Sequence, residues 1–325
     1  MNIYLTYDYE LFFGEKTGTV DKCIIEQTNS LLQIAQKYNI QMTFFVDVGF
    51  LIQLEKWSEK HSSLLIDLNK IKDQIQSIIQ LNSKVQLHIH PHWEKAYYDG
   101  EKWIINTENC YKLFDFSDDE INRIVSEYKV YLDDLVGYST TTFRAGGWCI
   151  QPFERLKPIF QRLGLKVDSS VFVGGQFESN NYYFDFRNAP HKCSYNFEND
   201  ICIEDINGCF LEVPISSHRY SPLFYWRLYI LGRLFPKNHK MLGDGIFLSQ
   251  PGRKKSVLTN FTWNHASSDG YYASKMNVIK NKLTKQSYEN MVVIGHPKSN
   301  THFSIRKLEN FVQRNHKKHS FISFD

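Results

Sequence analysis

The chain has 325 residues, of which 42% are apolar and 22% are charged, and its formal net charge is +3. These values are typical of a globular protein and exclude a disordered, collagen-like or coiled-coil chain. The small net charge gives no support to a nucleic-acid partner.

Short apolar runs alternate with segments of helical periodicity, which predicts an α/β protein with a mainly parallel sheet. A capping box from Ser117 to Glu120 marks the start of one helix, and Gly164 marks the end of another. In chain order, strands are expected at residues 3–7, 42–46, 85–90, up to 144, 165–168, 291–294 and 321–324. Helices are expected from residue 21, across residues 64–78, from 117 to about 135, over 152–164, and at 272–283 and 304–312.

Residues 171–270 break this alternation. Within them, Asn207 and Gly208 predict a hairpin that joins residues 201–203 to residues 210–213. We interpret the region as an irregular, β-containing insertion in a single domain that covers residues 1–325.

The segment from Leu223 to Phe235 is apolar except for Arg227, Gly232 and Arg233. It is shorter than the roughly 20 residues that a transmembrane helix requires. Two interpretations remain: a buried helix with snorkelling arginines, or a helix that lies in the plane of the inner membrane leaflet.

The six cysteines form no C-x-x-C pair and no recognisable zinc or disulfide framework. The first residues show no signal-peptide pattern. Together these features predict a cytoplasmic protein with reduced thiols.

Polar residues follow the predicted strands at several points in the chain. They are Asp8 and Glu10, then His88, His90 and His92, and further on Arg144, Asp168 and His296. In a barrel of parallel strands these ends share one rim, and that rim carries the active site.

Three histidines within five positions, beside carboxylates, predict a metal site for zinc, iron, cobalt or nickel. His88 and His90 project to one face of their strand, whereas Pro91 places His92 in the following loop. Asp8 and Glu10 also share a face, and their repulsion favours a shared cation or proton. The alternatives are hydrogen-bonded core histidines and a solvated pair of carboxylates.

Six short motifs contain these residues: TYDYE at 6–10, MTFFV at 42–46, HIHPH at 88–92, FRAGGW at 143–148, DSS at 168–170 and IGHP at 294–297. In this order they resemble the polysaccharide deacetylases, the NodB-homology proteins of carbohydrate esterase family 4. EVP at 212–214 resembles a strand of the cytoplasmic branches. The resemblance implies a distorted (β/α)7 barrel, one divalent metal and hydrolysis of a sugar N-acetyl group.

The resemblance also implies roles for individual residues. Asp8 resembles the general base, Arg144 the residue that orients it, and His296 the general acid, with Asp168 as the carboxylate that pairs with that acid. His88 and His92 resemble metal ligands.

The first motif departs from the family pattern, because Tyr9 separates Asp8 from Glu10 where most members have adjacent aspartates. We therefore favour Glu10 as the third ligand and keep Asp8 as the alternative. His90 is an alternative ligand or a partner of the ligands. Trp93 and Trp148 are candidates for stacking on a sugar ring.

We thus expect a metal-dependent sugar N-deacetylase of O-antigen or capsule biosynthesis. Its metal would be zinc, with cobalt, nickel, iron and manganese as alternatives. Its substrate would be an acetamido sugar in a nucleotide-linked, lipid-linked or oligosaccharide form. The rival hypotheses are a hydrolase of a formyl, O-acetyl or other C–N bond, and a carbohydrate-binding barrel without activity.

Overall fold

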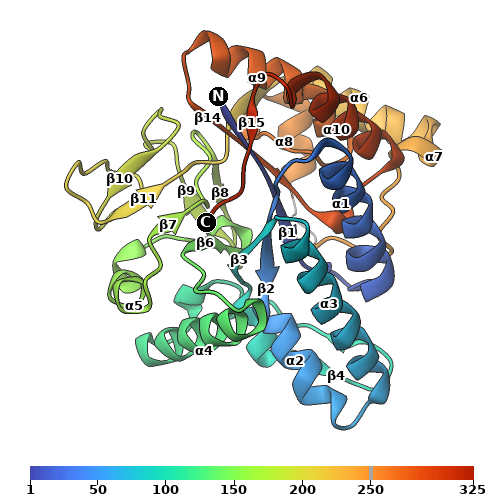
Figure 1. Cartoon of the computed structure of the whole chain (residues 1–325), viewed down its shortest axis with the longest axis vertical. Helices are drawn as coiled ribbons and strands as arrows, with labels where there is room; N and C mark the ends of the chain where they lie inside the picture. The colour runs from blue at the N-terminus through green and yellow to red at the C-terminus, as the bar shows by residue number, and fades with distance from the viewer. Residues whose placement is uncertain (249–251) are drawn as a thin grey trace.

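The computed structural model describes residues 1–248 and 252–325, and its centre is a curled parallel sheet. The parallel strands are β1 (Asn2–Tyr9), β2 (Thr43–Asp47), β3 (Lys84–Ile89), β6 (Thr142–Ala145), β7 (Val167–Asp168), β11 (Phe210–Glu212) and β14 (Asn290–Gly295). Their order is β11-β7-β6-β3-β2-β1-β14, with antiparallel β10 (Tyr195–Phe197) beside β11 and β15 (Ser320–Phe321) beside the start of β1. The sheet forms a half-barrel (Figure 1), so the predicted distorted barrel is confirmed.

Helices alternate with these strands and lie outside the curled sheet (Figure 1). They are α1 (Glu26–Tyr38), α2 (Val48–Ser58), α3 (Ser62–Gln80), α4 (Asp118–Val136), α5 (Lys157–Leu163), α9 (Met276–Lys285) and α10 (His302–Asn315). The Ser117 capping box begins α4 as predicted, and Gly164, with a φ of 72°, ends α5. The helix expected from Asp21 begins as a π-helical turn before α1, and α2 was not expected.

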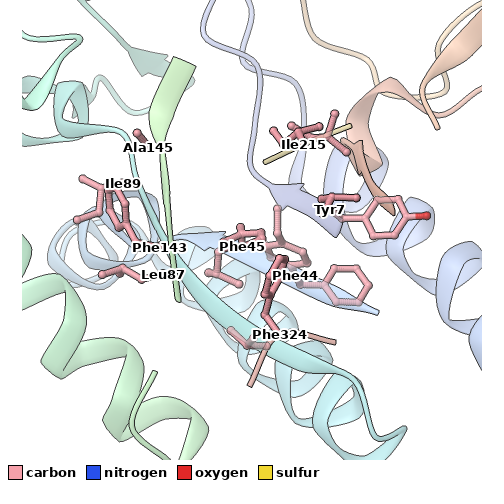
Figure 2. Packing of buried hydrophobic residues seen from close by; sticks show 14 of the residues in the cluster. Tyr7, Phe44, Phe45, Leu87, Ile89, Phe143, Ala145, Ile215 and Phe324 are labelled. Carbon is pink, nitrogen blue, oxygen red and sulfur yellow. The ribbon is translucent and has the colours of Figure 1, made fainter. Parts of the chain in front are cut away.

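The strands are buried on both faces, as is usual for a parallel sheet covered by helices. Every residue of β2 is buried, and Phe44 and Phe45 pack with neighbouring strands in the core (Figure 2). Phe324 closes one end of this core, since its ring stacks on Tyr4 at 4.6 Å and its N–H donates to Thr43 Oγ1 at 2.9 Å. The polar residues of the candidate site therefore lie at the opposite, carboxyl end of the strands.

The predicted hairpin is wrong in one of its strands. Strand β11 pairs with β10, six residues before the expected segment at 201–203, which forms a turn instead. Asp205 explains the error, because it accepts the backbone N–H of Asn207 and its own N–H donates to Asn196 O. The Asn207-Gly208 pair thus belongs to a longer loop.

The rest of the irregular region contains small hairpins and three helices. These are β8 (Gln176–Glu178) with β9 (Tyr183–Asp185), β12 (Ser217–Tyr220) with β13 (Thr262–His265), and α6 (Pro222–Leu234), α7 (Pro236–His239) and α8 (Arg253–Thr259). A further pair, β4 (Tyr97–Tyr98) with β5 (Trp103–Ile104), follows β3. Among the described helices, none is both long and apolar enough to span a bilayer.

Helix α6 corresponds to the apolar segment from Leu223 to Phe235. Only Phe224 and Tyr225 of this helix are buried, and they pack with Tyr220 and Val257 in a small cluster separate from the main core. The interpretation as a buried helix is therefore wrong.

Candidate active site

The carboxyl ends of four parallel strands converge on one group of ionisable side chains. Asp8 lies in β1 and Glu10 follows it, His88 lies in β3, Arg144 lies in β6, and His296 follows β14. All are buried except His296, which is partly exposed. His296 Nε2 is 3.6 Å from Asp8 Oδ2 and 3.8 Å from Glu10 Oε1, so the two ends of the sequence meet here.

Glu10, His88 and His90 form the tightest part of this group. Glu10 Oε2 is 3.1 Å from His88 Nε2 and 2.7 Å from His90 Nε2, and the three ligand atoms lie within 4.8 Å of one another. The geometry follows from the two-residue period of a strand, which projects residues 88 and 90 to the same face. This buried group is able to bind a divalent metal ion.

The expected ligand His92 is not part of that group. Pro91 begins a 3₁₀ turn that carries His92 away from the strand face, and its ring stacks on Tyr111 at 5.8 Å. Its ring nitrogens are buried and have no hydrogen-bond partner among the described residues. The structure thus places His90 where the family spacing predicts His92.

Three observations show that the Glu10, His88 and His90 side chains fit a metal. His88 Nδ1 lies 2.8 Å from the carbonyl oxygen of Arg144, which can only accept, so Nδ1 carries the proton and Nε2 faces Glu10. A backbone carbonyl on the second ring nitrogen is the usual support of a metal-binding histidine. Burial lowers the pKa of His90 to about 4, which keeps that imidazole neutral as a ligand must be.

The third observation is the charge of the site. Burial lowers the pKa of His88, but Asp8 and Glu10 outweigh it and raise that pKa to about 9. Burial raises the pKa of Glu10, yet Lys298 and His90 hold it well below its usual value. Lys298 Nζ is 2.8 Å from Glu10 Oε1, which leaves Oε2 facing the histidines. The carboxylates therefore attract a cation, either a proton or a metal ion, to the histidine side.

Asp8 is held by the fully buried side chain of Arg144. The guanidinium donates to Asp8 Oδ1 at 2.8 Å, to Thr6 Oγ1 at 2.9 Å and to the carbonyl and hydroxyl oxygens of Ser169. Its face packs on the ring of Phe45 at 4.1 Å. These contacts fix one carboxylate oxygen of Asp8 and leave Oδ2 toward His296.

The partner of His296 is Asp269 rather than the predicted Asp168. Asp269 Oδ2 is 2.7 Å from His296 Nδ1, and its Oδ1 accepts the backbone N–H of His296 at 2.8 Å. Burial lowers the pKa of His296, but the carboxylate of Asp269 outweighs it and raises that pKa. The backbone explains the pairing, since Ser267 bridges Ile294 in parallel and thereby aligns residue 269 with residue 296.

Asp168 belongs to a separate buried pair. Ser170 donates to both of its carboxylate oxygens, and Glu212 lies opposite it on the neighbouring strand. Burial raises the pKa of Asp168 to about 6 and that of Glu212 well above its usual value. Asp168 therefore lies against Ser170 and Glu212 within the sheet, and it is not the partner of His296.

Sequence reasoning missed Asp269, Lys298 and Asp47. Asp269 lies in the irregular region, where no pattern indicates its neighbours. Lys298 follows His296 by two positions, so its place in a strand-end motif was an available signal. Asp47 ends β2, accepts the indole N–H of Trp93 at 2.6 Å and has a pKa that burial raises to about 7.

A cavity of about 710 Å³ opens from this group of side chains. Asp8, Glu10 and His296 line one part, and Tyr225 and Trp148 are among its other lining residues. The predicted stacking residue Trp148 thus faces the cavity. Trp93 does not line it, since it is fully buried and bound to Asp47.

No protein-family model matches the sequence, and no curated protein matches it either. Similar solved structures include a protein from Mycobacterium smegmatis assigned as a polysaccharide deacetylase, with 13% identity, a TM-score of 0.48, and 99% of this chain and 86% of that chain covered. The allantoinase Puue is 11% identical to this chain with a TM-score of 0.47, and the match covers 99% of this chain and 87% of that chain. A pseudoenzyme of carbohydrate esterase family 4 from Bacillus anthracis is 11% identical with a TM-score of 0.38, and the match covers 98% of this chain and 62% of that chain.

All three structures are at most 13% identical to this chain, and their TM-scores lie below 0.5. The three names describe different activities, or none, so the likeness concerns the fold alone. Scores below 0.5 carry no argument about chemistry, which must come from the residues of the site.

Proposed function

We propose that this chain is a metal-dependent hydrolase that removes an N-acetyl group from an acetamido sugar. The observation that carries the proposal is the convergence of the Glu10, His88 and His90 group with Asp8 and His296 at one wall of the cavity. Amide hydrolysis needs an electrophile, a proton acceptor and a proton donor, and these side chains are suited to the three tasks.

Glu10, His88 and His90 would hold one divalent metal, and zinc suits two imidazoles and one carboxylate with a position left open. When bound, such a metal polarises a carbonyl oxygen and acidifies a water molecule. Cobalt, nickel, iron and manganese are the alternatives, which metal analysis distinguishes.

Asp8 and His296 would move the protons. Asp8 lines the cavity, and Arg144 holds its Oδ1 while Oδ2 lies toward His296, so Asp8 is placed to accept a proton from water. Asp269 holds His296 by Nδ1 and directs Nε2 toward Asp8 and Glu10. A raised pKa favours the imidazolium, which donates its Nε2 proton to the leaving amine.

For the substrate, we propose a nucleotide- or lipid-linked acetamido sugar of surface-polysaccharide biosynthesis, processed in the cytoplasm. A cavity of about 710 Å³ is larger than one sugar ring requires, which supports a substrate with a further group attached. Trp148 offers an aromatic wall for the sugar.

Acetate release from a panel of N-acetyl, N-formyl and O-acetyl sugars tests this function. His296→Ala should retain the metal and lose about two to four orders of magnitude of kcat, which is typical of a lost general acid. Full activity of that variant would refute the assigned role. Preference for a formyl or O-acetyl sugar would keep the hydrolase but change its substrate.

One observation favours a second function, a carbohydrate-binding barrel without activity. Lys298 places an ammonium group 2.8 Å from Glu10 Oε1, so the carboxylate has a cationic partner without any metal. Sugar binding by calorimetry, with neither metal uptake nor product release, would support this alternative.

A further inference from the structure

Helix α6 presents an apolar stripe to the outside of the protein. Leu223, Trp226, Ile230 and Leu234 are between 47% and 67% exposed. At 100° per residue, their spacing places them within an arc of about 80°. In Figure 1, α6 and α7 lie at the upper right of the molecule, with α7 at its edge. A continuous row of exposed large apolar side chains marks an interaction surface.

Cations flank this stripe on both sides. The same helical geometry places Arg227 and Arg233 about 20° beyond its two edges. Within the described residues, no carboxylate lies at ion-pair distance from either arginine or from Lys237 and Lys240, which follow the helix. Arg233 also lines the cavity, whereas Arg227 does not. An arginine beside an apolar stripe covers apolar surface with its stem and extends its charge toward an interface.

The charge of the surrounding sequence is strongly one-sided. Residues 213–268 contain eight Lys and Arg but only one acidic residue, Asp244, which gives +7 against +3 for the whole chain. The remaining residues therefore carry −4. The apolar stripe thus lies in the positive part of a protein that is otherwise negative.

The opposite face of α6 belongs to the cavity. Tyr225, Leu228 and Gly232 line the same cavity as Asp8 and His296. A surface bound to the outer face of α6 would therefore lie one helix diameter from the cavity.

We propose that the outer face of α6 docks in the plane of an anionic lipid bilayer. An apolar face between flanking cations is the pattern of an interfacial helix, whose apolar side chains reach about 5–10 Å into the headgroup region. Charge selects this occupant over a second copy of the chain, because a symmetric dimer would bring two segments of +7 together. Anionic headgroups supply the opposite charge.

Flotation with vesicles of phosphatidylcholine alone, or with 30% phosphatidylglycerol at low salt (about 50 mM), tests the proposal. The full chain should float with the anionic vesicles only. Ile230→Ser/Leu234→Ser should lose most of the bound fraction, whereas the control Leu65→Ser/Ile66→Ser, two exposed apolar residues of α3, should bind like the wild type. Neither variant removes a side-chain hydrogen bond, and thermal unfolding checks that both remain folded.

Charge is tested separately. Arg227→Glu/Lys237→Glu should weaken vesicle binding by about 25-fold or more, since each cation near an anionic surface contributes a factor of about five. The control Lys317→Glu/Lys318→Glu makes the same change in net charge on another surface and should bind normally.

Three results would overturn the proposal. They are no flotation with anionic vesicles, equal loss in the control variants, and a concentration-dependent dimer that Ile230→Ser/Leu234→Ser abolishes while flotation is absent. None of these measurements involves sugar hydrolysis or metal, so failure here and failure of the proposed function are distinguishable.

Discussion

Replacement of Asp269 by Asn tests the assignment of the proton donor most closely. The substitution keeps the size of the side chain and removes its charge, 2.7 Å from His296 Nδ1. Burial lowers the pKa of His296 and Asp269 raises it, so the variant should hold the imidazolium less strongly and its pKa should fall.

The expected magnitude follows from the hydrogen bond that changes. A bond to a charged group contributes about 1.5–3 kcal/mol and a neutral bond about 0.5–1.5 kcal/mol. The midpoints of these ranges differ by about 1.25 kcal/mol, which corresponds to a nearly tenfold change in the proton-binding equilibrium. Because the protonated form donates the proton, the alkaline limb of kcat/KM should move to lower pH. Activity should fall about tenfold on that limb and less at acidic pH.

The assay is acetate release across pH 5–9, together with an NMR titration of the His296 ring. Asp168→Asn is the matched control, because Asp168 is the partner that the family pattern predicts. An unmoved alkaline limb in Asp269→Asn, or an equal shift in Asp168→Asn, would refute the assignment.

Three further predictions concern stability and substrate binding. Arg144→Met should reduce the free energy of unfolding by about 3–5 kcal/mol, because it leaves Asp8 buried without its ion-pair partner. The folded pKa of Asp168, about 6, lies above the unfolded value of about 3.9, so its ionisation destabilises the fold as pH rises from 4 to 6. The free energy of unfolding of Asp168→Asn, measured relative to that of the wild type, should therefore be about 2–3 kcal/mol higher at pH 7 than at pH 4. Trp148→Ala should raise KM by about 2- to 12-fold with little change in kcat, as expected for lost aromatic stacking.

Urea unfolding measures the first two effects and steady-state kinetics measures the third. In Asp8→Asn/Arg144→Met, the loss of both charges should restore part of the stability, and no recovery would contradict the ion-pair argument. A pH-independent difference for Asp168→Asn would show that this carboxyl is not protonated in the fold. A lower kcat with unchanged KM in Trp148→Ala would exclude stacking.

Local sequence patterns predicted most of the fold. The alternation of apolar runs and helical periods located the parallel strands, and the Ser117 box and Gly164 located helix ends, because these signals act over a few residues. Helix α2 was missed because it follows β2 directly, with no turn between the two elements to mark its start. The hairpin prediction was wrong in one strand, because strand pairing depends on residues distant from Asn207.

The sequence likewise predicted only part of the candidate site. Strand ends predicted that Asp8, Glu10 and the histidines would lie together, and strand alternation alone favoured His90 beside His88, as the structure has it. The family spacing favoured His92, since spacing cannot show that Pro91 turns the chain. Asp269 could not be predicted from the sequence, because the bridge between Ser267 and the distant residue Ile294 brings it to the site.

The exposure of α6 also could not be read from its sequence. A row of apolar residues suits a buried helix and an interfacial helix equally well. Only the small cluster around Phe224 and Tyr225 shows which face is covered, and that the opposite face is exposed.

The metal content of the purified protein tests the central claim most directly. Wild type, His90→Ala and His92→Ala would be loaded with zinc, dialysed and analysed side by side. The account predicts about one equivalent in the wild type and in His92→Ala, and a loss of at least about tenfold in affinity in His90→Ala. No metal in the wild type, or loss in His92→Ala with retention in His90→Ala, would contradict it.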